Sequence, residues 1–516
     1  MKRTGYALGL AVAVASAGAV HAAELPTKKE VPAPPPNCFA SFWTWLDSSA
    51  SDCPLSAGPF TVYGTIDLGG GYFSSGANRS PLTDKMPYAI QKYANSSRWQ
   101  ANYNALSTSV LGIKMKQDLG FIGAPGWSLI GVLEAGINPY SGMFDNGPRS
   151  LADNNLNFTN KAPFSGAALD SSRAGQWDNS QGFIGVSNNV YGTLTFGRTN
   201  SLVLNALSAY DPVASVAYSL IGVSGSFPGF GDTETIRPNT AFTYRLNYQN
   251  FRAAFQAQVG GYGLGNATNG MYQGQLGRDF KLFGGSPYAG TLSLDAIGSW
   301  AKDAVSLSSF FGSNTTCLAA AGCFVNVNNQ LYDPNDVVKA TLSNNIDVAL
   351  LGRYKWNQWG FYGGYLYARL MNPSDDDLGG FQTIASGIFV PPGFYSKGVY
   401  INNAITNNAY NIQRVNMTYW GGAKYAVRPD LDVAFGYYFQ SQNDYNTTAC
   451  TGFGTTISSS KCAGGQQGVS LLVDWRPWKR VDLYAGVMRN SVFGGVSQGF
   501  NHTINWDPSA GVRVRF

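Results

Sequence analysis

The stretch VDLYAGV at residues 481–487 decides the fold. Its first, third, fifth and seventh residues are apolar, whereas Asp482, Tyr484 and Gly486 stand between them. Successive side chains of a strand point to opposite faces, so this segment needs an apolar medium on one face and tolerates water on the other. A soluble sheet can satisfy the same pattern. The number of times the pattern recurs separates the two cases.

The same alternation recurs along most of the chain, and it predicts about sixteen strands, an even number as bacterial barrels require. The expected strands cover residues 62–73, 108–118, 127–138, 180–188, 193–199, 239–247, 252–262, 270–282, 289–302, 345–356, 358–371, 412–426, 431–443, 467–477, 481–491 and 505–516. The sequence therefore predicts an all-β protein, a transmembrane antiparallel β-barrel.

The connections between these strands alternate between tight turns and long stretches. The long stretches are residues 74–107, 139–179, 200–238, 303–344, 372–411 and 444–466. Outer-membrane barrels sort their connections in this way, with short periplasmic turns and long extracellular loops. The same sorting places both chain ends on the periplasmic side.

Charged residues keep to one parity of the expected strands. Lys114 and Lys116 alternate with Ile113 and Met115. A lipid-facing Lys or Arg at mid-membrane costs about 2–4 kcal/mol, so the charged parity must face the lumen. A barrel of about sixteen strands is too wide to fill with its own side chains and leaves an aqueous channel.

The N-terminus has the layout of an exported protein. Residues 1–22 combine a short basic start, an apolar run and a small-residue cleavage site, which predicts a cleaved signal peptide. No later stretch has the roughly 18 uninterrupted apolar residues of a membrane helix. We expect a Pro-rich segment over residues 23–59 and the barrel over residues 60–516.

Composition excludes several functions. Only 13% of residues are charged, and no basic block of the kind that binds nucleic acid is present. The six cysteines fall into local pairs that we expect to be disulfides, although six cysteines allow fifteen connectivities. The pairs are Cys38 with Cys53, Cys317 with Cys323, and Cys450 with Cys462. Zinc is disfavoured because the mature chain keeps one histidine, and no metal or cofactor is expected.

Several segments resemble the general, trimeric diffusion porins of Gram-negative outer membranes. They are TVYGTID at 61–67, LGIK at 111–114, FIGV at 183–186, YGTLTFGR at 191–198 and the terminal Phe516. The resemblance implies a homotrimer in outer-membrane lipid, passive diffusion of small hydrophilic solutes and ions, and no enzyme activity. It also implies that Phe516 is the assembly signal.

The resemblance further implies that the third long loop, about residues 200–238, folds into the pore and opposes acidic groups to basic groups on the wall. Asp211 falls on the acidic position, and Lys114 and Arg237 match basic wall positions. The other candidates for the constriction are Arg245, Arg198, Asp232 and Glu234. Plainer interpretations remain: a solvated Lys114, a turn-forming Asp211 before Pro212, and a strand-end charge at Arg237.

Two other classes of function stay open. The long loops are also compatible with a substrate-specific channel that has a binding vestibule. An outer-membrane enzyme is disfavoured because His502 is the only histidine base left after cleavage. The acidic run 375–377 reads as a solvated loop tip or a weak calcium site, and an adhesin role through the loops is a further alternative.

Overall fold

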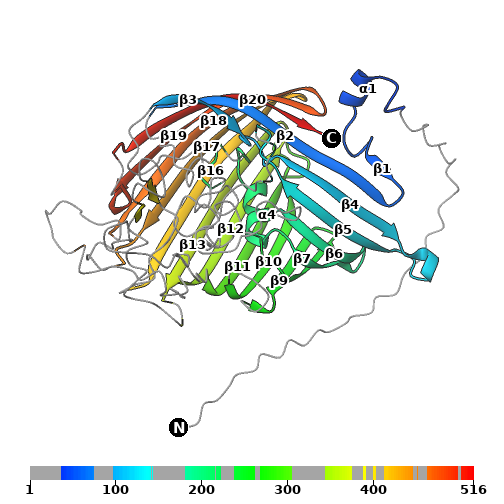
Figure 1. Ribbon diagram of the computed structural model, residues 1–516, viewed down its shortest axis with the longest axis horizontal. Coiled ribbons are helices and arrows are strands. Elements are labelled where there is room, and N and C mark those ends of the chain that lie inside the picture. Colours follow the sequence, from blue (N-terminus) through cyan, green and yellow to red (C-terminus); the bar gives the residue numbers. More distant parts are fainter. Residues whose placement is uncertain are drawn as a thin grey trace, which may run out of the picture.

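The structure is a computed structural model. It describes residues 37–74, 97–140, 142, 144, 180–215, 217–221, 237–261, 268–304, 343–372, 374, 388–390, 399–401, 412–445, 450, 462–497 and 501–516. Antiparallel strands dominate these residues and curl into a barrel (Figure 1). Within the same residues, none of the helices combines the length and the apolar character that crossing a membrane requires.

The strands form a closed ring of sixteen positions. β2 (Phe60–Phe73) pairs with both β3 (Arg98–Tyr103) and β4 (Val110–Asp118), so these two short strands share the second position. The other positions are β5 (Trp127–Gly136), β6 (Gln181–Asn188), β7 (Gly192–Arg198), β8 (Ala241–Tyr248), β9 (Phe251–Gln258), β10 (Thr268–Leu282), β11 (Gly290–Ala304), β12 (Ser343–Trp356), β13 (Trp359–Met371), β16 (Arg414–Arg428), β17 (Leu431–Gln442), β18 (Gly464–Trp478), β19 (Val481–Gly494) and β20 (Ile504–Arg515). The expected antiparallel barrel of sixteen strands is confirmed.

A few short elements lie outside this ring. β1 (Leu55–Ala57) pairs with the start of β2, and β14 (Ile388–Val390) pairs with β15 (Val399–Ile401). Among the described residues, the short helices are α1 (Phe42–Leu46), α4 (Leu202–Ala209), η1 (Gly120–Ile122) and η3 (Gly495–Ser497).

The first and last strands close the ring. β2 pairs with β20 from Thr65↔Arg515 to Gly71↔Ser509. Beyond this ladder, the Gly64 N–H donates to the Phe516 carbonyl at 3.0 Å, and the Phe516 N–H donates back at 3.0 Å. A Cβ on residue 64 would overlap the Phe516 ring, so the closure needs glycine at this position.

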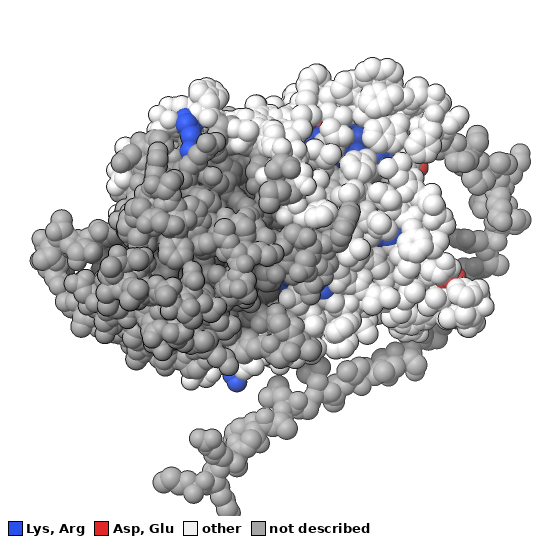
Figure 2. Space-filling view, in the orientation of Figure 1, with Lys and Arg blue, Asp and Glu red and all other residues white. Residues whose placement is uncertain are grey.

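The two faces of the ring have the opposite polarity that the alternation predicts. Outward-pointing Leu350 and Leu471 are 52% and 46% exposed, whereas inward-pointing Asp347 and Ser470 are buried. Figure 2 shows a described outer surface with only isolated charged side chains. Since exposed apolar side chains on this scale require a nonaqueous neighbour, the outer face suits lipid and the inner face suits water.

The turns gather at one end of the ring, here called the turn end, where the C-terminus also lies. Connections at this end are as short as residues 249–250, 357–358, 429–430 and 479–480. Aromatic side chains pack in pairs there: Trp127–Tyr191, Tyr288–Trp356 and Trp359–Tyr425 have ring centroids 6.0, 5.7 and 4.5 Å apart. Such pairs form the aromatic girdle that barrels place at a membrane interface.

Candidate functional site: the lumen and its inner loop

The connection between β7 and β8, residues 199–240, enters the barrel and is called the inner loop. It begins with α4, which Figure 1 shows inside the ring of strands. Ser201 caps this helix, because its side chain accepts a hydrogen bond from the Leu204 N–H at 3.1 Å. The buried face of α4 consists of Leu202, Val203, Ala206 and Leu207.

The first half of the inner loop is attached to the wall formed by β10–β16. The Leu202 N–H donates to the Gln273 side chain on β10 at 2.7 Å. At the helix end, the Tyr210 hydroxyl hydrogen bonds to Asp295 on β11, and the Trp420 indole on β16 donates to the Tyr210 carbonyl at 3.0 Å. Polar wall residues therefore satisfy the loop's backbone, which a buried loop requires.

Asp211 joins the inner loop to β17. It is 3% exposed and accepts hydrogen bonds from the Tyr438 hydroxyl at 2.5 Å and the Val213 N–H at 3.1 Å. Burial raises the pKa of the Asp211 carboxyl, while hydrogen bonds from Ser219, Tyr438 and the backbone lower it in part. The structure thus places this carboxyl group in a buried contact between loop and wall, not on a surface that borders the channel.

The loop continues along the wall to the strands near the closure. The Tyr218 hydroxyl hydrogen bonds to the Ser509 side chain on β20 at 2.7 Å. The Ala217 N–H donates to the Ala105 carbonyl, which lies between β3 and β4, at 2.8 Å. Attachments at β10, β16, β17 and β20 therefore hold the described part of the loop along one long side of the lumen.

Arg198 and Arg237 lie together at the base of the inner loop. Arg198 donates to the Arg237 carbonyl at 2.8 Å and to the Asn239 side chain at 2.9 Å. Arg237 donates to the Asn200 side chain at 3.1 Å. Both arginines are nearly fully buried, so they brace the two ends of the loop against each other.

The remaining candidates have different positions. Lys114 is exposed on the inward face of β4, with its ammonium 5.8 Å from the Tyr63 ring. Arg245 is half-buried on β8, opposite Thr193. Asp232, Glu234, Cys317, Cys323 and the acidic run 375–377 lie outside the described residues.

Sequence reasoning missed a set of lumen charges on the later strands. On β9–β11, Arg252 forms ion pairs with Asp279 at 2.7 Å and Asp295 at 3.2 Å. Asp295 also holds Tyr210, so this group supports the inner loop. These residues fall on the polar parity of their strands, which places them on the lumen face, but parity alone does not show which of them form pairs.

A second set of lumen charges lies on β16–β20. Arg476 pairs with Asp432 and Asp474 at 2.9 Å each. Asp482 pairs with Arg513 at 2.9 Å and with Arg515 at 3.1 Å. These fixed dipoles line a water-filled interior near the turn end, where ordered charges orient water and disfavour apolar solutes.

Two of the three expected disulfides are confirmed. Cys38 bonds to Cys53, and Cys450 bonds to Cys462. Asp444 lies close to the second pair, but both sulfur atoms are committed to the disulfide and are not available as thiolate ligands.

Comparison with known proteins agrees with this geometry. The sequence matches the Gram-negative porin family over residues 9–492. The fold is similar to that of an anion-selective porin from Comamonas acidovorans, with a TM-score of 0.51, 14% identity, and coverage of 89% of this chain and 99% of that chain. It is also similar to OmpT of Vibrio cholerae, with a TM-score of 0.51, 13% identity, and coverage of 90% and 100%. A comparison with curated proteins finds no match. Because the family match spans most of a chain that forms a hollow barrel, the chain belongs to the Gram-negative porin family and forms an outer-membrane diffusion channel.

Proposed function

We propose that this channel is a general one, which passes small hydrophilic solutes and ions without a dedicated binding site. The observation that supports this proposal is the chemistry of the inner loop. Its apolar residues pack on the wall, while the exposed residues of its described part are Ser208, Ala209 and Ala214. Small uncharged side chains narrow a pore without offering a solute strong contacts.

We propose that the constriction lies between this loop and the basic residues on the inward faces of β4 and β8. Lys114 and Arg245 supply the wall charges, and Asp232 and Glu234 are the candidates for acidic groups on the loop. Asp211, Arg198 and Arg237 hold the loop in place through the buried contacts described above. The wall charges then set ion preference, and the anchored loop sets the exclusion size.

Liposome swelling with sugars of graded size tests the general mechanism. We expect swelling rates that fall smoothly with solute size and rise linearly with concentration, because a channel without a binding site does not saturate. Saturable flux of one sugar would establish the alternative, a substrate-specific channel with a binding vestibule.

We propose that the chain assembles as a homotrimer. The strands β6–β9 are short, with 8, 7, 8 and 8 residues, so this side of the wall is called the low side. The strands β10–β13 have 13–15 residues. A strand needs about 9–11 residues to cross the hydrocarbon core. The strands of the low side are too short to span the hydrocarbon core. We therefore expect other copies of the chain, and not lipid, to cover the outer surface of β6–β9.

We assign the turn end to the periplasm and residues 1–22 to a cleaved signal peptide. The support is the separation of short turns from long connections, together with the presence of the C-terminus at the turn end (Figure 1). Mass spectrometry of protein extracted from outer membranes tests the leader, because a mature N-terminus near residue 23 is expected.

A further inference from the structure

Residues 37–59, which precede the barrel, form a folded unit here called the N-terminal module. The Cys38–Cys53 disulfide closes it, α1 lies within it, and β1 joins it to β2. Ser41 caps α1, because its side chain accepts from the Thr44 N–H at 3.1 Å. Neither the channel nor its constriction uses this module, so its presence calls for another role.

The turn between β18 and β19 binds the module tightly through one side chain. Arg480 is 1% exposed and donates to the carbonyls of Trp45, Ser49 and Cys53 at 2.9, 3.2 and 2.7 Å. Its guanidinium also lies 4.6 Å from the centroid of the Trp45 ring. The module therefore has a fixed place on the rim of the turn end.

The module lies on the lipid side of that rim. Val481 shares its face of β19 with Leu483, which points outward and is 37% exposed, yet Val481 is only 7% exposed. The start of β19 is therefore covered, although Leu483, two residues farther along on the same face, is exposed to lipid. Figure 1 shows α1 beside the C-terminus, beyond the ends of the strands.

The module also exposes large aromatic side chains. Phe39, Phe42 and Trp43 are 65%, 63% and 62% exposed. The Trp43 ring packs against Trp478 of β18, with centroids 5.7 Å apart. Trp478 ends the strand that carries the outward-facing Trp475, so the aromatic patch continues the girdle of the turn end.

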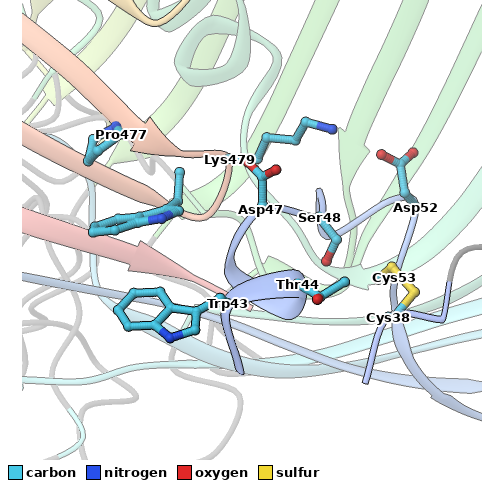
Figure 3. Close-up of a pocket in the computed structure, with 10 residues that line it drawn as sticks. Cys38, Trp43, Thr44, Asp47, Ser48, Asp52, Cys53, Pro477 and Lys479 are labelled. Carbon is cyan, nitrogen blue, oxygen red and sulfur yellow. A yellow bond between two sulfur atoms is a disulfide. The ribbon is translucent and has the colours of Figure 1, made fainter. Parts of the chain in front are cut away.

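A pocket of about 650 Å³ lies between α1 and the β18–β19 turn, next to these rings (Figure 3). Asp47, Asp52 and Lys479 line it together with Trp43 and Trp478. Within the described part of the chain, neither of these two carboxylates takes part in an ion pair, and nor does this ammonium group. A hydrophobic wall beside charges of both signs matches a zwitterionic headgroup at the edge of its acyl chains.

We propose that the N-terminal module anchors the periplasmic rim to the membrane by binding a phospholipid with a zwitterionic, amine-bearing headgroup. Asp47 and Asp52 receive the ammonium group, Lys479 receives the phosphate, and the rings of Phe42, Trp43 and Trp478 contact the glycerol and upper acyl chains. The proposal rests on the periplasmic assignment of the turn end. Exposed aromatic rings also stack on sugars, but the continuity of this patch with the lipid-facing girdle favours lipid.

Photocrosslinking in the native outer membrane tests the partner. A photoreactive phenylalanine analogue placed at Phe42 is expected to yield phospholipid adducts by mass spectrometry. The matched control is the same analogue at Ser56, an exposed residue of the same module whose partner Thr61 lies on the lumen face; it is expected to yield none. Peptidoglycan adducts at Phe42, or the absence of lipid adducts, would overturn the proposal. Lipopolysaccharide adducts would instead place this rim on the cell surface, which would refute both the proposal and the periplasmic assignment.

Lipid retention tests the headgroup site. Native mass spectrometry of protein from mixed phosphatidylethanolamine and phosphatidylglycerol nanodiscs is expected to show preferential retention of phosphatidylethanolamine. The double variant Asp47→Asn, Asp52→Asn should reduce that retention about five- to tenfold, because two partly solvated ion pairs are lost. Asp118→Asn, at an exposed carboxylate elsewhere on the turn end, should leave it unchanged. Equal retention of phosphatidylethanolamine by the double variant and the wild type would refute the headgroup assignment. Unchanged single-channel conductance in all variants would show that the barrel and its channel are intact.

Discussion

Asp211 and Tyr438 stand 227 positions apart in the sequence and meet in one buried hydrogen bond. The pair links the inner loop to β17 without exposing a charge to the channel. Lys114 has the opposite environment, since its ammonium group is exposed on the inward face of β4. Charge type alone therefore does not define a role, because burial decides which side chain holds the loop and which one meets the passing ion.

Tyr438→Phe removes the donor of this hydrogen bond and should cost the loop attachment about 1–2 kcal/mol. We expect more open-channel noise and a somewhat larger conductance, with an unchanged anion-to-cation permeability ratio. We expect the same changes in noise and conductance for Asp211→Asn, because this substitution weakens the same hydrogen bond. Planar-bilayer recordings measure all three quantities, and an altered ratio with unaltered noise would instead place the Asp211 charge in the ion path.

Lys114→Gln removes an exposed lumen charge and should lower the anion-to-cation permeability ratio by up to about fivefold, since a single charge acts weakly through water. Reversal potentials in a salt gradient measure the ratio. The control is Lys281→Gln, at an exposed residue close to the β10–β11 turn. Equal effects of the two substitutions would rule out a local role for Lys114. Raising the salt concentration should shrink the Lys114 effect, because counterions screen exposed charges.

The inner loop and the N-terminal module each have several contacts with the wall, and in each of them one buried charged side chain makes multiple hydrogen bonds. The loop uses Asp211, and the module uses Arg480 of the β18–β19 turn. Through β1 on β2 and α1 on this turn, the module spans the strand β20 that closes the ring. The Arg515 N–H donates to the Arg480 carbonyl at 2.9 Å, which ties β20 into the same contact.

Arg480→Ala leaves the carbonyls of Trp45, Ser49 and Cys53 without their donor and should weaken docking of the module by about 2–4 kcal/mol. Faster hydrogen exchange over residues 42–53 is the expected result, with no change in the exchange of β10–β13. Lys479→Ala, at the exposed neighbouring residue, serves as the control. Unchanged exchange in the Arg480 variant would mean that the disulfide and β1 hold the module alone.

The barrel wall as a whole is asymmetric, with a low side at β6–β9 and a high side at β10–β20. The strands of the low side, with 7–8 residues each, are shorter than the roughly 9–11 residues needed to cross the hydrocarbon core. This difference supports the proposed trimer, because another protein surface that covers the low wall would keep lipid away from it. The inner loop reinforces the high side from within, where its attachments on β10, β16, β17 and β20 lie.

Two matched substitutions separate the sides. Ile184 on β6 and Leu350 on β12 both point outward and are 53% and 52% exposed. Ile184→Arg should dissociate the trimer while the folded monomer persists, because it places a charge in the proposed subunit contact. Leu350→Arg should hinder membrane insertion instead, at a cost of about 2–4 kcal/mol. Native mass spectrometry and heat-modified gel mobility distinguish the outcomes, and a trimer that tolerates Ile184→Arg would exclude the low wall as the interface.

The sequence by itself determined the barrel. Alternation of apolar and polar residues is a local property, and a one-residue shift would turn every side chain to the wrong face, so segments such as 481–487 specify strand and orientation together. The spacing of these strands also located the turns and the long connection at 200–238. The cysteine positions predicted the two disulfides that the structure shows, whereas the inward path of the third loop was implied by the family resemblance.

Only the tertiary structure decided what the charged residues do. Asp211 follows the family pattern of an acidic loop position, but its burial depends on Tyr438, which no local pattern connects to it. Arg480 reads as an ordinary turn charge, and Arg252 pairs with Asp295 across the intervening strand β10. Burial and pairing depend on which strands become neighbours and where the loop lies across them, because the free energy of a charge is set by its surroundings and not by its place in the sequence.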